Sequence, residues 1–118
     1  MYLAYVVLSA LFAVMLTMSA RMKLVRDPMA VEVIGDIVGV PLRFFPVLAM
    51  LEVAGAVGLL IGIGLRSLGV VAGIALVVYF MVATSAHLRR RDIVPGHLLP
   101  PVMMLALSAG ALVLRVAT

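Results

Sequence analysis

The chain has 118 residues, of which 66% are hydrophobic and 12% are charged, with a formal net charge of +4. A soluble domain carries roughly 25% charged residues, so this composition excludes an ordinary water-soluble fold. The absence of cysteine excludes disulfides, CxxC redox chemistry and covalent haem attachment. The excess of basic residues does not indicate nucleic-acid binding, because the chain has no soluble domain that could bind it. We interpret these residues as loop charges that set membrane topology.

Four long apolar stretches follow one another along the chain, at residues 2–20, 44–65, 68–86 and 98–114. Each is close to the roughly 17–25 residues that cross a hydrocarbon core of ~30 Å. Their unbroken apolar character lacks the alternation of a membrane β-strand, which excludes a barrel. The sequence therefore predicts one all-α domain, residues 1–118, built as an antiparallel bundle of four transmembrane helices.

The first stretch could also be a secretory signal peptide, because Met18-Ser19-Ala20 faintly resembles a cleavage site. No lysine or arginine precedes the apolar run, so the positively charged region of a signal peptide is missing. A retained first span is the favoured interpretation.

Residues 21–43 form the one sizeable segment between spans. Asp27-Pro28 is a typical helix start, since aspartate caps free N–H groups and proline suits the first helical position. Apolar residues then recur at a helical period, with two acidic residues on the other side: Ala30, Val33, Ile34, Ile37 and Val38 against Glu32 and Asp36. We predict a short helix on the membrane surface that ends at Gly39-Val40-Pro41.

The second and third spans are separated by a very short turn, which we place at Arg66-Ser67, so they should form an antiparallel hairpin. Each carries a GxxxG pattern, at residues 58–62 and 69–73, and such patterns let helix backbones approach closely. We favour packing inside the bundle, while a homo-oligomeric seam stays an alternative.

Lysine and arginine are distributed unequally between the predicted membrane sides. Arg66 and Arg115 belong to one side, and seven basic residues belong to the other: Arg21, Lys23, Arg26, Arg43, Arg89, Arg90 and Arg91. The positive-inside rule then places both connecting loops in the cytoplasm and both termini outside.

Glu52 is the most informative residue for function. It lies about eight residues inside the second span, or ~12 Å below the boundary at 1.5 Å per residue. A carboxylate facing lipid at that depth costs several kcal/mol, so it should face the bundle interior or a wet cavity. It could be an acid–base group or an anchor for a ligand hydroxyl or carbonyl; the alternative is a structural hydrogen bond or ion pair between helices.

His87, at the end of the third span, shares its helix face with Thr84 and points inward. It could titrate near neutral pH and pair with a carboxylate, or simply lie at headgroup level. Tyr79 should lie near the depth of Glu52, and its hydroxyl needs a partner if it is buried.

Lys23, Arg43 and Arg89 lie near the mouth of any cytoplasmic cavity, where they could attract an anionic substrate. Contact with lipid headgroups is the simpler interpretation. Eight of the nine methionines lie toward this half, as suits an adaptable apolar pocket, although ordinary packing is more common. A metal or haem on His87 and His97 is disfavoured, since two histidines make a sparse ligand set.

Several short motifs, in order, are similar to those of the DoxX-like family of small four-helix membrane proteins. They are Lys23, Asp27-Pro28, Gly39-Val40-Pro41, the run Leu51-Glu52-x-x-Gly55-x-x-Gly58-Leu-Leu-x-Gly62, and His87-x-Arg89 followed by Asp92. The resemblance covers nearly the whole chain. It implies functional roles for Lys23, Glu52 and His87, and a multi-pass location in a bacterial plasma membrane.

Two functions are compatible with these features. In the first, the protein binds or transforms a lipophilic small molecule, with Glu52 as the buried acid–base group or anchor, His87 as its partner and Tyr79 as a hydrogen-bond donor. Lys23, Arg43, Thr84 and Arg89 would then be binding residues. Isomerisation, cyclisation or epoxide opening would need no cofactor or metal, and a quinone could use the same groups. In the second, the chain is a non-catalytic subunit that anchors a soluble redox or sulfur-metabolism partner, as the family resemblance implies; the missing cysteines argue against direct sulfur relay.

Overall fold

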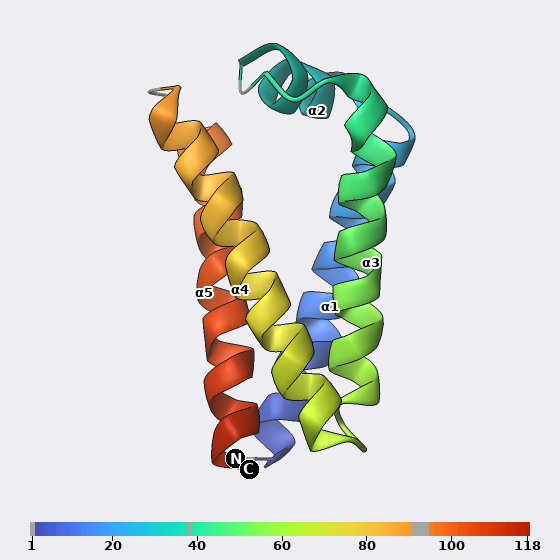
Figure 1. Ribbon diagram of the computed structural model, residues 1–118, viewed down its shortest axis with the longest axis vertical. Helices are drawn as coiled ribbons and strands as arrows, with labels where there is room; N and C mark the ends of the chain where they lie inside the picture. The colour runs from blue at the N-terminus through green and yellow to red at the C-terminus, as the bar shows by residue number, and fades with distance from the viewer. Residues whose placement is uncertain (1, 38, 91–94) are drawn as a thin grey trace.

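The computed structural model describes residues 2–37, 39–90 and 95–118, and within them it contains helices and no strand. The four long helices are α1 (Tyr2–Leu24), α3 (Phe45–Ile61), α4 (Arg66–Arg89) and α5 (Pro95–Ala117). Three short elements connect α1 to α3: α2 (Pro28–Ala30), the π-helix η1 (Val31–Ile37) and the 3-10 helix η2 (Leu42–Phe44). The predicted all-α four-helix class is confirmed (Figure 1).

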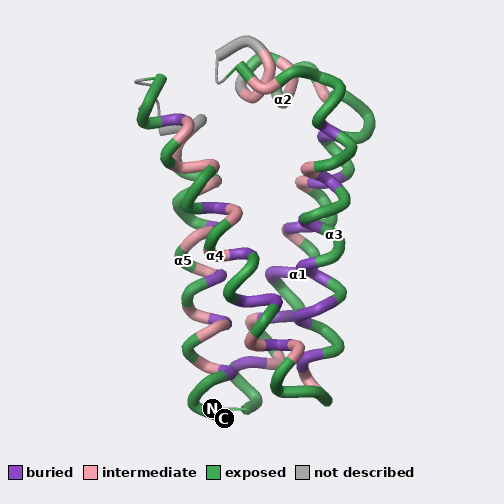
Figure 2. Tube along the Cα trace, in the orientation of Figure 1, coloured by how far each residue is buried: buried purple, intermediate pink, exposed green. Residues whose placement is uncertain are grey.

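Four segments are long and apolar enough to cross a bilayer: Tyr2–Leu24, Leu42–Ile61, Arg66–Arg89 and Leu98–Ala117. The side chains that face away from the bundle are as apolar as those inside it. On α1, for example, Tyr5, Phe12 and Leu16 are fully buried, whereas Leu3 and Leu11 are mostly exposed. Since exposed leucines on every side suit lipid rather than water, the chain is a multi-pass integral membrane protein (Figure 2).

The helices form two close pairs, α1 with α3 and α4 with α5. Figure 1 shows these pairs converging at the end that holds both termini and separating toward the other end, where α2 and η1 lie across the top. The apolar core is therefore concentrated in the converging half, around Tyr5, Phe12, Leu59 and Leu76.

Small residues set the close approach of α3 and α4. A Cβ built on Gly62 would lie 2.3 Å from the Cα of Gly69, and one built on Gly58 would lie 2.8 Å from the Cβ of Ala72. A Cβ on Gly73 would meet Leu112 of α5 at 3.1 Å. The two GxxxG patterns thus pack inside the bundle, as predicted.

Arg115 closes the end of the bundle at which the termini lie. Its side chain is buried, its Nε donates a hydrogen bond to the carbonyl of Gly62 at 2.8 Å, and its guanidinium lies over the rings of Tyr2 and Tyr5 at 5.6 and 5.3 Å. The Tyr5 hydroxyl in turn donates to the Leu59 carbonyl at 2.9 Å. Cation–π contacts and a carbonyl acceptor compensate the buried charge and tie α5 to α1 and α3.

The predicted turn at Arg66-Ser67 is wrong by a few residues. Helix α3 ends at Ile61, the turn occupies residues 62–65, and Arg66 begins α4. Two glycines, Gly62 and Gly64, favour the turn over continued helix because glycine is a poor helix former.

The segment after α1 begins as predicted, with Asp27 accepting a hydrogen bond from the Met29 N–H at 3.0 Å. It then adopts π-helical geometry over Val31–Ile37 rather than the expected α-helical period. Glycine and β-branched residues hold an α-helix weakly, which is consistent with the wider turn. Val38 and the side chains of Ala30, Val33, Asp36 and Ile37 lie outside the described residues, and the location of this segment at the membrane surface stays a prediction.

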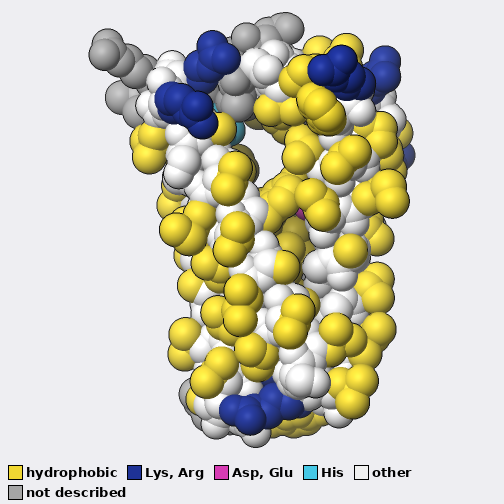
Figure 3. Space-filling view, viewed as in Figure 1, with side chains coloured by type: hydrophobic (Ala, Val, Ile, Leu, Met, Phe, Trp, Pro, Cys, Tyr) yellow, Lys and Arg dark blue, Asp and Glu magenta, His cyan; other side chains and the backbone are white. Residues whose placement is uncertain are grey.

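Described basic residues gather at the two ends of the bundle, with an apolar belt between them (Figure 3). Arg66 and Arg115 lie at the end of the termini, and six of the predicted seven lie at the opposite end, whereas Arg91 is outside the described residues. Which end faces the cytoplasm stays a prediction.

Gly62→Ala should destabilise the protein by about 1–3 kcal/mol, because the new methyl group would overlap the backbone of Gly69. Gly64→Ala is the matched control, since its Cβ would meet nothing closer than the Ile61 carbonyl at 3.8 Å. Thermal unfolding in detergent measures both variants. Equal melting temperatures would contradict the proposed close contact of α3 and α4.

Candidate functional site

Glu52 and Lys23 form an ion pair inside the bundle. Glu52 is fully buried on α3 and Lys23 is 8% exposed near the end of α1, and the Lys23 Nζ donates a hydrogen bond to Glu52 Oε1. The same Nζ donates to Ser19 Oγ at 2.9 Å, and the Tyr79 hydroxyl of α4 donates to Glu52 Oε1 at 2.9 Å. Three helices therefore converge on one carboxylate.

Local sequence spacing explains how these groups meet. Ser19 and Lys23 are four residues apart and lie on one face of α1, so the hydroxyl and the ammonium are neighbours. On α3, Gly55 lies one turn from Glu52, and the Leu76 side chain of α4 occupies the space that a Cβ at Gly55 would fill, 2.5 Å away. Tyr79 follows Leu76 by one turn and is thereby brought within reach of Glu52.

One oxygen atom of the Glu52 carboxylate is not used as a hydrogen-bond acceptor in the described part of the chain. Both hydrogen bonds from Lys23 and Tyr79 go to Oε1, and Glu52 Oε2 has no hydrogen-bond partner within the described residues. An ion pair is the usual way to lower the cost of a charge in a membrane interior, and an unused acceptor beside it can take a proton. The pair can thus act as an adjacent acid and base.

A cavity of about 650 Å³ lies next to this pair, in the half of the bundle where the helix pairs separate. Lys23, Ser19 and Tyr79 supply polar groups to its wall, and Phe80 and Pro101 are among its apolar lining. Five methionines also line it: Met15, Met18, Met22, Met29 and Met104. Such flexible side chains give an apolar wall that can adapt to the shape of a ligand.

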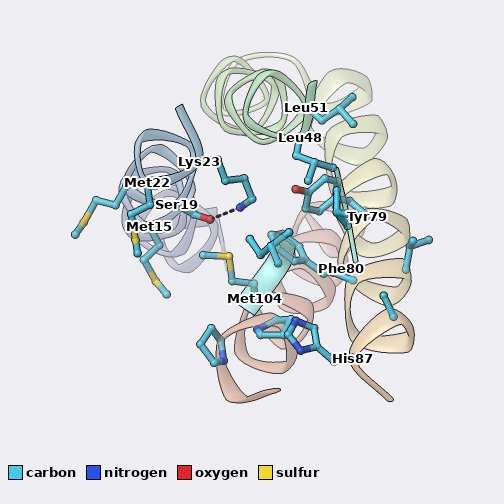
Figure 4. A pocket seen from close by; sticks show the side chains of 18 of the residues that line it. Met15, Ser19, Met22, Lys23, Leu48, Leu51, Tyr79, Phe80, His87 and Met104 are labelled. Carbon is cyan, nitrogen blue, oxygen red and sulfur yellow. Dashed lines mark hydrogen bonds between the residues drawn. The ribbon is translucent and has the colours of Figure 1, made fainter. Parts of the chain in front are cut away.

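Figure 4 shows Lys23 extending from α1 into this space, with Tyr79 and Phe80 on the side of α4. The segment between α1 and α3 covers the top, because Ile34 and Val40 also line the cavity. A Cβ at Gly39, whose φ is +90°, would meet the guanidinium of Arg90 at 2.8 Å, so α4 is in contact with this cover. In Figure 3 the surface between α3 and α4 is hollowed directly beneath it.

The structure places the predicted site residues in two groups. Glu52, Tyr79 and Lys23 are brought together, and His87 is buried and lines the cavity on another side from Lys23 (Figure 4). The hydrogen-bond partners of Glu52 are Lys23 and Tyr79, so the expected pairing of His87 with Glu52 is not what the structure has. At 1.5 Å per residue, His87 lies ~12 Å farther along α4 than Tyr79, which is too far for a direct bond.

Three other predicted binding residues lie away from the cavity wall. Arg43 is exposed and lies over the Phe44 ring at 4.9 Å, and Arg89 is exposed at the end of α4. Thr84 Oγ1 is buried without a hydrogen-bond partner among the described residues. None of the three is a lining residue in the described part of the chain, and their roles stay predictions.

Among the described residues, no three His, Cys, Asp or Glu side chains are close enough together to hold a metal ion. The His97 side chain, which belonged to the disfavoured haem alternative, lies outside the described residues.

The sequence predicts Lys23 near the mouth of a cavity, whereas the structure has it as the ion-pair partner of Glu52. The signal was present, since intramembrane charges normally pair and Lys23 ends the first span at a depth comparable with Glu52. Ser19, one helical turn before Lys23, was missed altogether because a lone serine in an apolar helix carries no distinctive pattern.

A sequence model described as the DoxX-like family matches residues 7–111, which is most of the chain. No curated protein matches the chain. No solved structure matches it either.

Removing one partner of the Lys23–Glu52 pair should cost about 3–5 kcal/mol, because a buried charge is left alone. Lys23→Met and Glu52→Gln are therefore each expected to lower the melting temperature in detergent. The double variant should be no less stable than the worse single variant, since neither charge remains. Thr17→Ala, which removes only a hydroxyl bonded to its own helix, is the control. If the stability lost in the double variant equalled the sum of the losses in the two single variants, the two side chains would not interact.

Proposed function

This chain belongs to the DoxX-like family, and we propose that it binds a lipophilic small molecule in the cavity beside the Lys23–Glu52 pair. The observation that carries the proposal is an apolar cavity of about 650 Å³ with Lys23, the ion-pair partner of the buried Glu52, at its wall, inside a protein embedded in lipid. Small-molecule sites have volumes of roughly 300–1,000 Å³ and combine apolar walls with a few polar groups.

The location of the cavity supports a ligand that arrives from the bilayer. Its walls come from spans α1, α3, α4 and α5, and the hollow between α3 and α4 faces the apolar belt rather than an end of the bundle (Figure 3). A molecule dissolved in lipid could enter sideways there. Transfer between lipid and an apolar cavity costs little, so the polar groups of the wall would decide which molecules are retained.

The polar wall favours a ligand that accepts hydrogen bonds. Lys23 is a donor at the cavity wall with one N–H beyond those given to Glu52 and Ser19, and a carbonyl or hydroxyl oxygen is a suitable acceptor for it. The one O–H of Tyr79 is already donated to Glu52. A quinone meets this requirement, because its two carbonyl oxygens are hydrogen-bond acceptors. Chemical transformation would use Lys23 and Glu52 as acid and base in a site shielded from water, with His87 on another wall of the cavity.

A photoreactive long-chain alcohol bearing a diazirine tests the binding proposal. We expect it to label the protein at cavity residues, as mapped by mass spectrometry, and Ala83→Phe should reduce this labelling at least tenfold by filling a lining position. Ala75→Phe adds the same ring on an exposed face of the same helix and should change nothing. Unchanged labelling in Ala83→Phe would remove the proposed site and leave a membrane subunit that anchors a partner as the better account.

We further propose a bacterial plasma membrane as the location, as the family resemblance implies, and place both basic connecting loops in the cytoplasm on the strength of the charge asymmetry. Because the chain has no cysteine, single-cysteine variants report sidedness cleanly. In intact spheroplasts an impermeant maleimide should label Ser67→Cys, in the first turn of α4, and should label Leu42→Cys only after lysis. The reverse labelling pattern would show that the opposite orientation is the correct one.

A further inference from the structure

Lysine is used once in this chain. Of its nine basic residues, eight are arginine and one, Lys23, is lysine. Arginine stays charged under all ordinary conditions, whereas lysine can give up its proton and then acts as a nucleophile. The single lysine is thus the one basic side chain able to form a covalent bond to a carbonyl group.

The position of Lys23 suits that chemistry. Its side chain is almost completely buried, lines the apolar cavity and extends into it (Figure 4). Glu52 accepts one of its hydrogen bonds and Ser19 accepts another. Glu52 Oε2 lacks a hydrogen-bond partner among the described residues and can receive the proton that the amine must lose.

A purely structural ion pair would not require this arrangement. An arginine would bind the carboxylate through two parallel hydrogen bonds and would occupy both of its oxygens, as such pairs commonly do. Lysine leaves one oxygen unused and places the nitrogen atom at a cavity wall. Buried lysines next to an acid–base group are a recognised way to activate an amine toward carbonyl substrates.

We propose that Lys23 forms a protonated imine with a lipophilic aldehyde or ketone bound in the cavity. The inference rests on the proposed function and specifies the chemical class of its ligand. Glu52 is the acid–base group for the reaction and afterwards the counter-ion of the imine, while Tyr79 holds the carboxylate in place through its hydrogen bond.

The reaction balances without an oxidant or a reductant. The Lys23 ammonium passes one proton to Glu52, and the neutral nitrogen attacks the carbonyl carbon, which forms the C–N bond. The carbonyl oxygen takes up that proton and a second proton from nitrogen, the C–O bond breaks, and water leaves. The product retains one proton on nitrogen as a positively charged imine, paired with the Glu52 carboxylate.

Reduction with cyanoborohydride tests the proposal, because it converts an imine into a stable secondary amine. Purified protein in detergent is incubated with an apolar terpenoid aldehyde such as citral, reduced, digested and analysed by mass spectrometry. We expect the adduct on the Lys23 peptide to form at least tenfold faster than in protein unfolded with sodium dodecyl sulfate. The N-terminal amine, which lies on a different peptide, is an internal reference.

Matched variants separate chemistry from structure. Lys23→Arg keeps the charge and should give no adduct at this position. Glu52→Gln keeps the shape but loses the acid–base group, and should slow adduct formation by about 100-fold, the usual contribution of acid–base catalysis. Adduct formation in Glu52→Gln at the wild-type rate would overturn the role given to Glu52 and with it the proposal.

The photoreactive alcohol distinguishes failure of this inference from failure of the proposed function, because it has no carbonyl group. If the alcohol labels the cavity but the aldehyde gives no adduct above the unfolded reference, the site binds lipophilic molecules and the imine proposal is wrong. If neither reagent reaches the cavity, the proposed function fails and this inference fails with it.

Discussion

A charged pair enclosed in a membrane bundle is the constraint on which the rest of the structure depends. Glu52 is fully buried, and in a bilayer a carboxylate at that depth is stable only with a partner. Lys23 supplies the opposite charge from α1, and Tyr79 adds a hydrogen bond from α4. The pair therefore fixes the relative positions of three helices at one level.

The bundle is divided into a close-packed half and an open half. In the close-packed half, glycines let α3 and α4 approach backbone to backbone, and Arg115 joins α5 to the turn after α3. In the open half the two helix pairs separate, and larger or more flexible side chains, above all methionine, line the resulting space. Because the close-packed half already secures the helices, the open half can retain a cavity at little cost in stability.

The Lys23–Glu52 pair lies beside this open half, so that the Lys23 amine and the cavity are next to each other. The segment between α1 and α3 covers the cavity from the end of the bundle, and its contact with Arg90 links it to α4. A lipid-soluble ligand would then meet the amine in surroundings shielded from bulk water, where hydrogen bonds and charge interactions are stronger than in solution.

The number of long helices, the all-helical class and the burial of Glu52 can be predicted from the sequence, because each follows from the cost of exposing polar groups to lipid. Three features depend on how the helices pack and could not be predicted: Lys23 rather than His87 pairs with Glu52, the turn occupies residues 62–65, and the segment after Asp27 continues as a π-helix. Helical periodicity gives the face and depth of a side chain within one helix. It does not give the rotation and separation of neighbouring helices, which depend on how Gly55, Gly58 and Gly62 fit against α4, and those contacts decide which side chains meet.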